Sequence, residues 1–327
     1  MTVVDQIIRH LMTKRRILVA THTHPDGDAV GSLVAMGLAL YAADQRPTFY
    51  IESPIPAVYR FLPSVSRIQR HIEDLTRFDT AVILDCGDLE RIGARGPALA
   101  RIPTVINIDH HVTNSGFGTI QLVDTNACAT AEIVYRLIRR MDVPVDADMA
   151  TAIYTGIFTD TGSFRFSNTN RSAFAICEEM VQRGVDPYQV AQKVYGTYSL
   201  GRIKLLNMAL DSIEISENGK LSVMTLTQRM FEETGTHPED VDGIINYARR
   251  IEDVQVAVLI LENETNGNGA GKETRPFHIS LRSDGTVDVS AIAAHFGGGG
   301  HRSAAGFNIE SRIAELKSEI IDLSETI

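Results

Sequence analysis

The stretch "THTHPDGDAVGS", which begins at residue 21, carries side chains that could bind a divalent metal ion. His22, Asp26 and Asp28 are separated by a proline and a glycine that bend the chain, so the three side chains can converge where a strand gives way to a helix. The alternative is a capped turn in which Asp28 is the N-cap of that helix. Metal chemistry is therefore indicated only if other segments supply further ligands.

Three later segments offer such ligands, each at the end of an apolar run: "TAVILDCGD", "TVINIDHH" and "FTDTGSF". In chain order they supply Asp85, Asp88, Asp109, His110, His111 and Asp160. Adjacent side chains at a strand end point in opposite directions, so we expect at most one of the two histidines to bind metal and its neighbour to have another task.

Histidine nitrogens combined with carboxylates favour Mn²⁺ or a similar divalent ion, whereas a structural zinc site would use thiolates. Asp26, Asp28, Asp85 and Asp160 carry four negative charges, which would balance two divalent ions and would repel one another without any ion. We therefore expect a two-metal centre. Two ions that share a water produce hydroxide near neutral pH and hold phosphoryl oxygens, so hydrolysis of a phosphate ester or anhydride is the reaction that this set serves best.

A second chemical feature is "FGGGGHRSAAG", which begins at residue 296. Consecutive glycines destabilise regular structure, so we expect their backbone N–H groups to approach an anion, with His301 and Arg302 adding positive charge. Arg282, on a strand leading toward this segment, could contact a phosphate or a carboxylate through two hydrogen bonds. The alternatives are a plain flexible turn and a surface arginine.

Strand-like and helix-like segments alternate in the first half of the chain. Strands are predicted at 16–20, 80–88 and 104–111, and helices at 29–43, 129–141 and 147–160. This alternation predicts an α/β fold with a mostly parallel sheet. The polar clusters all follow strands, and functional groups of such sheets lie beyond the carboxyl ends of the strands.

The second half of the chain has a different order of secondary-structure elements. A helical stretch at 183–213 lacks strand signals, and after it come strands at 220–227, 254–263 and 275–283 and a C-terminal helix. We predict three parts, namely an N-terminal domain at 1–187, a helical connector at 188–213 and a C-terminal domain at 214–327. The loop at 263–273, rich in Gly and Asn, is predicted to connect a hairpin, with no chemical role.

Composition sets the wider limits. The chain has 327 residues, of which 44% are apolar and 22% charged, enough for two packed domains. Its net charge of −10 argues against long duplex nucleic acid as a partner, but not against a small anionic ligand. With no apolar run of roughly 18 residues and no signal-peptide pattern, we expect a cytoplasmic protein without a membrane partner. Cys86, Cys128 and Cys177 are expected to be buried thiols.

Taken in order, the motifs "HTHPDGDAVGS", "DCGD", "DHHVTN", "TDTGSF" and "FGGGGHRSAAG" resemble those of the DHH/DHHA1 phosphoesterases. Within that family the chain resembles the NrnA-like branch of bifunctional oligoribonucleases and 3′-phosphoadenosine 5′-phosphate (pAp) phosphatases. The resemblance covers nearly the whole chain. It implies an N-terminal DHH domain, a helical connector and a smaller C-terminal α/β DHHA1 domain that binds substrate, with the active-site cleft between the domains.

The resemblance also implies a ligand set for two divalent cations, expected to be Mn²⁺. One ion would be held by His22, Asp26 and Asp85, and the other by Asp28, Asp85, His110 and Asp160, with Asp85 bridging.

Further roles follow from the same resemblance. His111 would contact the scissile phosphate or protonate the leaving oxygen, and Asp109 would orient a ligand histidine. Family members often have Asn where His24 stands, so His24 is not expected to be a ligand. The terminal phosphate of the substrate would be held by Arg282, Gly298, Gly299, Gly300 and His301.

The implied function is hydrolysis of short oligoribonucleotides (nanoRNA) to mononucleotides, with pAp as an additional substrate. The main alternative is a phosphodiesterase for cyclic or linear dinucleotides such as c-di-AMP and pApA. RecJ-like exonucleases usually carry additional nucleic-acid-binding parts, and the manganese pyrophosphatases lack the "GGGGH" segment. A nucleotide-binding regulator without turnover is a further alternative, disfavoured because every expected ligand is present. The sequence leaves a homodimer open.

Overall fold

The computed structural model divides the chain into two compact units, Met1–Thr197 and Tyr198–Ile327. It describes residues 2–13, 16–196, 198–241, 243–264 and 273–326. The division falls within the segment expected to be a helical connector. Helix α7 (Pro187–Tyr195) packs into the core of the first unit, and α8 (Leu200–Asp211) packs into the second.

A six-stranded, fully parallel sheet forms the centre of the N-terminal unit, which confirms the predicted fold class. Its strand order is β3-β2-β1-β4-β5-β6. The strands are β1 (Ile17–Ala20), β2 (Thr48–Tyr50), β3 (Ile68–Gln69), β4 (Thr80–Leu84), β5 (Thr104–Asp109) and β6 (Ile120–Val123). β1 and β4 are buried along their whole length, which explains why they read as continuous apolar runs.

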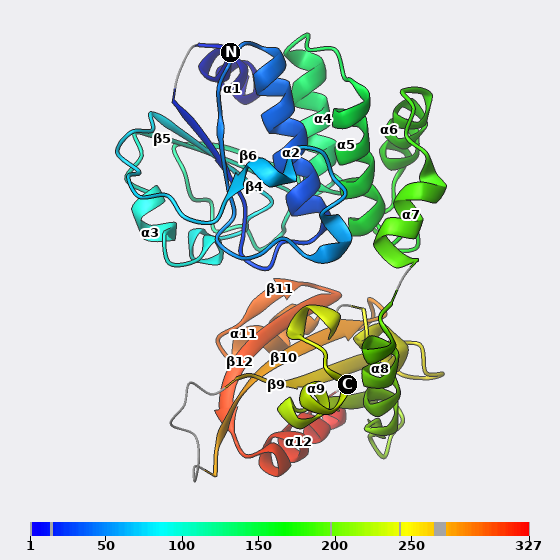
Figure 1. The fold of residues 1–327 in the computed structure, drawn as a ribbon. Coiled ribbons are helices and arrows are strands. Elements are labelled where there is room, and N and C mark those ends of the chain that lie inside the picture. The colour runs from blue at the N-terminus through cyan, green and yellow to red at the C-terminus, as the bar shows by residue number, and fades with distance from the viewer. Residues whose placement is uncertain (1, 14–15, 197, 242, 265–272, 327) are drawn as a thin grey trace. The chain divides into compact units, whose positions relative to one another are not determined.

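Helices cover both faces of this sheet. Besides α7, they are α1 (Val3–Met12), α2 (Gly27–Ala42), α3 (Gly96–Leu99), α4 (Thr130–Arg140), α5 (Ala147–Asp160) and α6 (Arg171–Gln182). α2, α4 and α5 lie side by side in the larger core on one face, and α3 lies on the other face (Figure 1). Alternate residues of β1 enter the two cores, because side chains on a strand alternate between faces.

Two glycines allow α2 and α5 to pack closely. A Cβ atom on Gly31 would lie 2.5 Å from the carbonyl oxygen of Ala152, and one on Gly156 would lie 2.9 Å from Oδ1 of Asp28. Any larger residue at either position would push the helices apart. The contact matters because α2 carries Asp28 and α5 ends at Asp160.

The C-terminal unit contains a mixed six-stranded sheet with the order β11-β12-β10-β9-β8-β7. Its strands are β7 (Glu214–Ile215), β8 (Leu221–Leu226), β9 (Val256–Glu262), β10 (Arg275–Ser283), β11 (Gly299–His301) and β12 (Ala304–Ser311). β8 and β9 are parallel and the other pairs are antiparallel. The remaining helices are α9 (Gln228–Thr234), α10 (Ile245–Arg249), α11 (Val289–His295) and α12 (Ile313–Asp322). The sheet carries one apolar core on each face.

Several smaller expectations can be compared with this fold. β9 and β10 pair antiparallel, as a hairpin requires, although residues 265–272 of the connecting loop lie outside the described residues. Gly299 and Gly300 belong to β11, so two of the four consecutive glycines lie in a strand. The three cysteines are buried and free. Within the described ranges, no helix has the length and apolar character that a bilayer crossing needs.

Candidate metal centre

The acidic and histidine side chains singled out in the N-terminal unit come together at the carboxyl ends of β1, β4 and β5. Three groups have one possible ligand atom per residue, all within 4.8 Å of one another: His22, Asp26 and Asp85; Asp28, His110 and Asp160; and Asp85, Asp109 and His111. Asp88 belongs to none of these groups. Its carboxylate instead accepts a hydrogen bond from the backbone of Glu90 at the start of the short 3-10 helix η3 (Leu89–Ile92).

Asp85 lies at the middle of the arrangement. Its Oδ2 is 3.5 Å from Nε2 of His22, and its Oδ1 is 3.7 Å from Nε2 of His110, so the two oxygens face two different groups. Asp85 adopts a left-handed backbone with a φ of 54°. Such a conformation is uncommon outside glycine and tends to occur where a side chain must be aimed at a functional site.

The turn between β1 and α2 prepares two of the candidate ligands. Nδ1 of His22 lies 2.7 Å from the carbonyl oxygen of Thr23 and donates to it, so Nε2, which faces Asp85, is the ring nitrogen left to bind an ion. Asp26 is the N-cap of α2 and accepts from the backbone N–H of Ala29 at 2.9 Å. The capping role that the sequence suggested for Asp28 therefore belongs to Asp26.

Asp28 is buried against the N-terminus of α4. Its Oδ2 accepts from the backbone N–H of Thr130 at 2.6 Å, and its Oδ1 accepts from Ala131 N–H at 2.9 Å and from the Ser32 hydroxyl at 3.0 Å. The carboxylate thereby satisfies two free N–H groups at the helix start, because Ala129, the N-cap, has no polar side chain that could accept from them. A carboxylate has about four acceptor positions, so one remains for an ion.

Thr130 joins two candidate ligands. While its backbone N–H holds Asp28, its hydroxyl donates to Oδ1 of Asp85 at 3.0 Å, and all three residues are buried. The sequence analysis did not identify Thr130. It lies 102 positions from Asp28 in the chain, and a threonine near a helix start has no pattern that would reveal such a contact.

Asp160 and His110 complete the second group. Nε2 of His110 is 3.7 Å from Oδ2 of Asp160, and that oxygen also accepts from the side-chain amide of Asn168 at 3.0 Å. Asp160 is the last residue of α5, where the negative end of the helix dipole favours a cation. Asn168, like Thr130, was not identified from the sequence.

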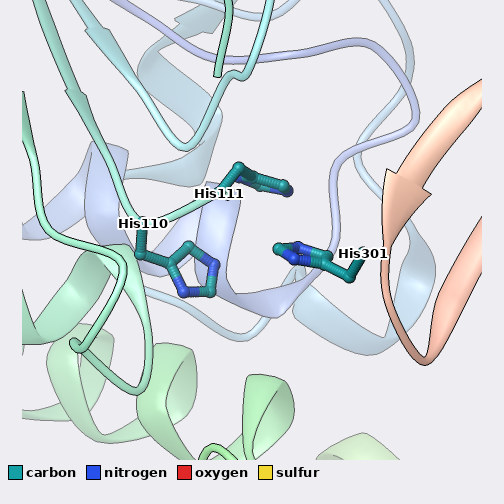
Figure 2. Close-up of side chains that lie close together, drawn as sticks. All are labelled: His110, His111 and His301. Atoms are coloured by element: carbon teal, nitrogen blue, oxygen red, sulfur yellow. The ribbon is translucent and has the colours of Figure 1, made fainter. Parts of the chain in front are cut away.

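His111 lies beside His110, as Figure 2 shows, but it belongs to a different chain of contacts. Its ring centre is 5.0 Å from that of His110, with the planes inclined at 68°, and its Nδ1 donates to Oδ1 of Asp109 at 2.6 Å. Asp109 in turn accepts from the side-chain amide of Asn114 at 2.6 Å. Asp109 therefore orients His111, whereas the sequence analysis expected it to orient a ligand histidine.

Electrostatic strain in the centre shows in the pKa values of the buried groups. Burial raises the pKa of Asp28 well above its ordinary value, and the charges of Asp85 and Asp160 raise it further. Burial also raises the pKa of Asp160, to about 7. Burial opposes protonation of His110, but the charges of Asp160 and Asp85 outweigh it and raise the pKa of His110 to about 9. Burial would raise the pKa of Asp85 too, but the hydrogen bond from His22 and the charges of nearby histidines hold it low.

This donor set fits divalent cations. Imidazole nitrogens and carboxylate oxygens are gathered with more negative charge than the surrounding protein neutralises, and thiolates are absent from the groups that the described residues form. The buried carboxylates would repel one another unless cations or protons balanced them.

His24 belongs to none of these groups. It is exposed, has a left-handed backbone with a φ of 53°, and its backbone N–H donates to the Ser53 hydroxyl at 2.7 Å. Histidine, like asparagine and aspartate, is among the residues other than glycine that adopt this backbone conformation most often.

The predicted anion-binding residues lie in the C-terminal unit. Arg282 of β10 pairs in register with Ala304 of β12, which pairs in register with His301 of β11. Residues in one register row share a face of the sheet, so the arginine and the histidine lie on the same face, two strand spacings or about 10 Å apart, with only a methyl group between them.

The four glycines have separate structural tasks. Gly297 and Gly298 end α11, because Gly297 has a φ of 76° and the two backbone N–H groups donate to Ala294 and Ala293. The N–H of Gly298 is therefore already used. A Cβ atom on Gly300 would lie 2.4 Å from a carbonyl oxygen of β12, whereas one on Gly299 would meet nothing within 4 Å. Packing within the unit does not require a glycine at position 299.

Comparisons with known proteins agree with both units. The model of the DHH family N-terminal domain matches residues 16–157, and the model of the DHHA1 domain matches residues 218–326. A bifunctional oligoribonuclease and PAP phosphatase NrnA from Thermus thermophilus is 32% identical over 90% of this chain and 84% of its own length. The protein of the same name from Bacillus subtilis is 26% identical over 94% of this chain and 93% of its own length.

A solved structure supports the same fold. An exopolyphosphatase-related protein from Bacteroides fragilis superimposes with a TM-score of 0.87 at 26% identity, covering 98% of this chain and 95% of that protein.

Thr130→Val should weaken metal binding. Valine keeps the shape of the side chain and the backbone N–H that holds Asp28, but it removes the hydrogen bond to Asp85. We therefore expect a loss of Mn²⁺ affinity of roughly 10- to 100-fold, as is typical of groups that support metal ligands. Isothermal titration calorimetry measures the affinity. The matched control is Thr155→Val, because Thr155 is equally buried but its hydroxyl donates only to the carbonyl of Thr151. Equal affinities for the two variants would contradict the role of Thr130.

Metal binding should release protons. At pH 7 the metal-free protein holds a proton on His110 and part of one on Asp160, because both pKa values are raised, and both groups must lose their protons to act as ligands. We therefore expect Mn²⁺ affinity to rise as the pH increases from 6 to 9. Titrations at pH 7 in buffers of different ionisation enthalpy should give different heats of binding, whereas heats that are independent of the buffer would contradict this prediction.

Proposed function

Because the chain belongs to the DHH family of phosphoesterases, we propose that it hydrolyses short oligoribonucleotides to mononucleotides and also removes a phosphate from pAp. The names of two curated relatives that align over most of their length support this substrate class. The observation that carries the proposal is the group of buried histidines and carboxylates around Asp85, which suits phosphate-ester hydrolysis.

The proposed centre holds two divalent cations, with Mn²⁺ as the expected ion. His22, Asp26 and Asp85 would hold one ion, and Asp28, His110 and Asp160 would share Asp85 to hold the other. When bound, such ions lower the pKa of a water and neutralise phosphoryl oxygens.

His111 is proposed to supply the leaving-group proton. Its Nδ1 proton is committed to Asp109 at 2.6 Å, so Nε2 is the nitrogen that can serve the substrate. As a water oxygen gives up a proton to solvent and forms its bond to phosphorus, the P–O bond to the leaving group breaks, and the leaving oxygen takes the Nε2 proton of the cationic ring. The carboxylate of Asp109 fixes the ring and stabilises its cationic form, and Asn114 holds that carboxylate in place.

We assign the terminal phosphate of the substrate to the C-terminal unit. Arg282 and His301, on one face of the sheet, would supply positive charge and hydrogen-bond donors. Gly299 would let the phosphate approach the backbone, since no packing contact explains a glycine there. The net charge of −10 is consistent with a short substrate rather than a long polynucleotide.

Cyclic and linear dinucleotides are the competing substrates, because the same centre would hydrolyse their phosphodiester bonds. A regulator without turnover is disfavoured, since the ligand residues lie together rather than being dispersed. Localisation in the cytoplasm and a homodimeric state stay predictions.

With Mn²⁺, the purified protein should convert di- to pentaribonucleotides into mononucleotides and should release phosphate from pAp. The panel should include pApA, c-di-AMP and pyrophosphate, with products separated by chromatography. Asp85→Asn should reduce turnover more than about 100-fold, beyond the effect of residues that only support ligands. Asp88→Asn is the control, since it follows the same strand and an asparagine caps η3 equally well. Intact short ribonucleotides would contradict the proposed substrate.

Gly299→Ala should raise KM and leave the fold unchanged. The added methyl group meets no protein atom, so we expect a wild-type Tm together with weaker binding of substrates that carry a terminal phosphate. Gly298→Ala provides the contrast, because its methyl group would lie 2.1 Å from a carbonyl oxygen of β12 and should lower Tm. An unchanged KM for Gly299→Ala would remove this glycine from the binding site.

A further inference from the structure

Arg91 is a basic residue at the metal centre that neither binds an ion in the proposed ligand set nor donates the leaving-group proton. It lies in η3, six positions after Asp85, and its carbonyl oxygen accepts from the backbone N–H of Thr23 at 2.7 Å and from the Thr23 hydroxyl at 3.0 Å. Thr23 follows His22 directly. The backbone of Arg91 is therefore fastened to two segments that carry candidate ligands.

The side chain of Arg91 reaches His111. Its Nη1 lies 3.4 Å from Nε2 of His111, the nitrogen proposed to face the leaving oxygen. Because Nδ1 of His111 donates to Asp109, the neutral ring presents a lone pair at Nε2 that the guanidinium can meet. Arg91 is exposed whereas Asp85 is buried, so the guanidinium lies on the side of the centre from which a substrate could enter.

The guanidinium of Arg91 forms no ion pair with a carboxylate of the described residues, although it reaches His111 of the group that also contains Asp85 and Asp109. By contrast, Arg136 of the same unit pairs with Asp124 at 2.8 Å. An arginine that stays unpaired beside several carboxylates keeps its guanidinium available for an anionic ligand.

Charge balance identifies the chemistry of that ligand. Two divalent ions would neutralise the four carboxylates of the ligand set. A phosphodiester that enters this site adds a negative charge, which the positive charge of Arg91 would match. A planar guanidinium also offers two parallel N–H groups to two phosphoryl oxygens.

We propose that Arg91 binds the non-bridging oxygens of the scissile phosphate and stabilises the charge that develops on them during hydrolysis. This inference rests on the proposed function, since it assigns the phosphate to the same centre. The structural task near Arg91 is performed by its backbone carbonyl, which is retained when the side chain is replaced by alanine or lysine. Removal of the side chain can therefore be separated from disruption of the turn.

The test compares Arg91→Ala and Arg91→Lys with Arg101→Ala, which removes an exposed arginine after α3 as a control. We expect Arg91→Ala to lower kcat by about 100-fold, as for the loss of one preorganised donor, while Tm and Mn²⁺ affinity stay at wild-type values. Arg91→Lys should recover part of the loss, because it keeps the charge but not the paired donors. A kcat within twofold of wild type for Arg91→Ala would overturn the inference.

A second measurement does not depend on turnover. Inorganic phosphate, added to the Mn²⁺-loaded protein, should raise the Tm of the wild type and of Arg101→Ala more than that of Arg91→Ala. Equal Tm shifts would contradict the role of Arg91 even if the protein hydrolysed none of the ribonucleotides. Failure of the wild type to hydrolyse any substrate of the panel, with the phosphate effect intact, would instead contradict the proposed function.

Discussion

Mutual repulsion among the clustered carboxylates, of which Asp28 and Asp85 are buried, limits how the N-terminal unit can build its site. Each acid is stabilised by a different element: Asp26 by the start of α2, Asp28 by the start of α4, Asp85 by Thr130 and neighbouring histidines, and Asp160 by Asn168. Helix N-termini are the natural partners of negative charge, so the arrangement of α2 and α4 against the parallel sheet follows from the same requirement. Divalent ions would remove the repulsion that remains.

The sequence was sufficient to predict the sheet and the location of the site. The strands β1, β4 and β5 are buried on both faces, so they appear as continuous apolar runs separated by helical segments. In a parallel sheet the carboxyl ends of the strands meet at one edge, which brings His22, Asp85 and His110 together although they are far apart in the chain. This inference needed only the type and order of the elements.

Other features could not be predicted because they depend on tertiary contacts. β2 and β3 contain three and two residues, too few for a periodic pattern to be recognised. Thr130, Asn168 and Arg91 act on residues of other elements, and their own neighbours in sequence do not reveal this. The glycines that follow α11 were predicted to bind an anion through their backbone, and this stays a prediction. Their local roles, in which the first two terminate the helix and the others enter a strand, could not be derived from the sequence.

The double role of Asp28 affects how related sequences should be interpreted. An asparagine at this position would set its amide N–H against the backbone N–H groups of α4, so the fold favours an aspartate even without a metal. Position 26 needs only a good N-cap, and serine, threonine or asparagine would serve the helix equally well. In a related protein that had lost catalysis, Asp28 would therefore be retained because the fold needs it. A change at position 26 would be the better sign that activity had been lost.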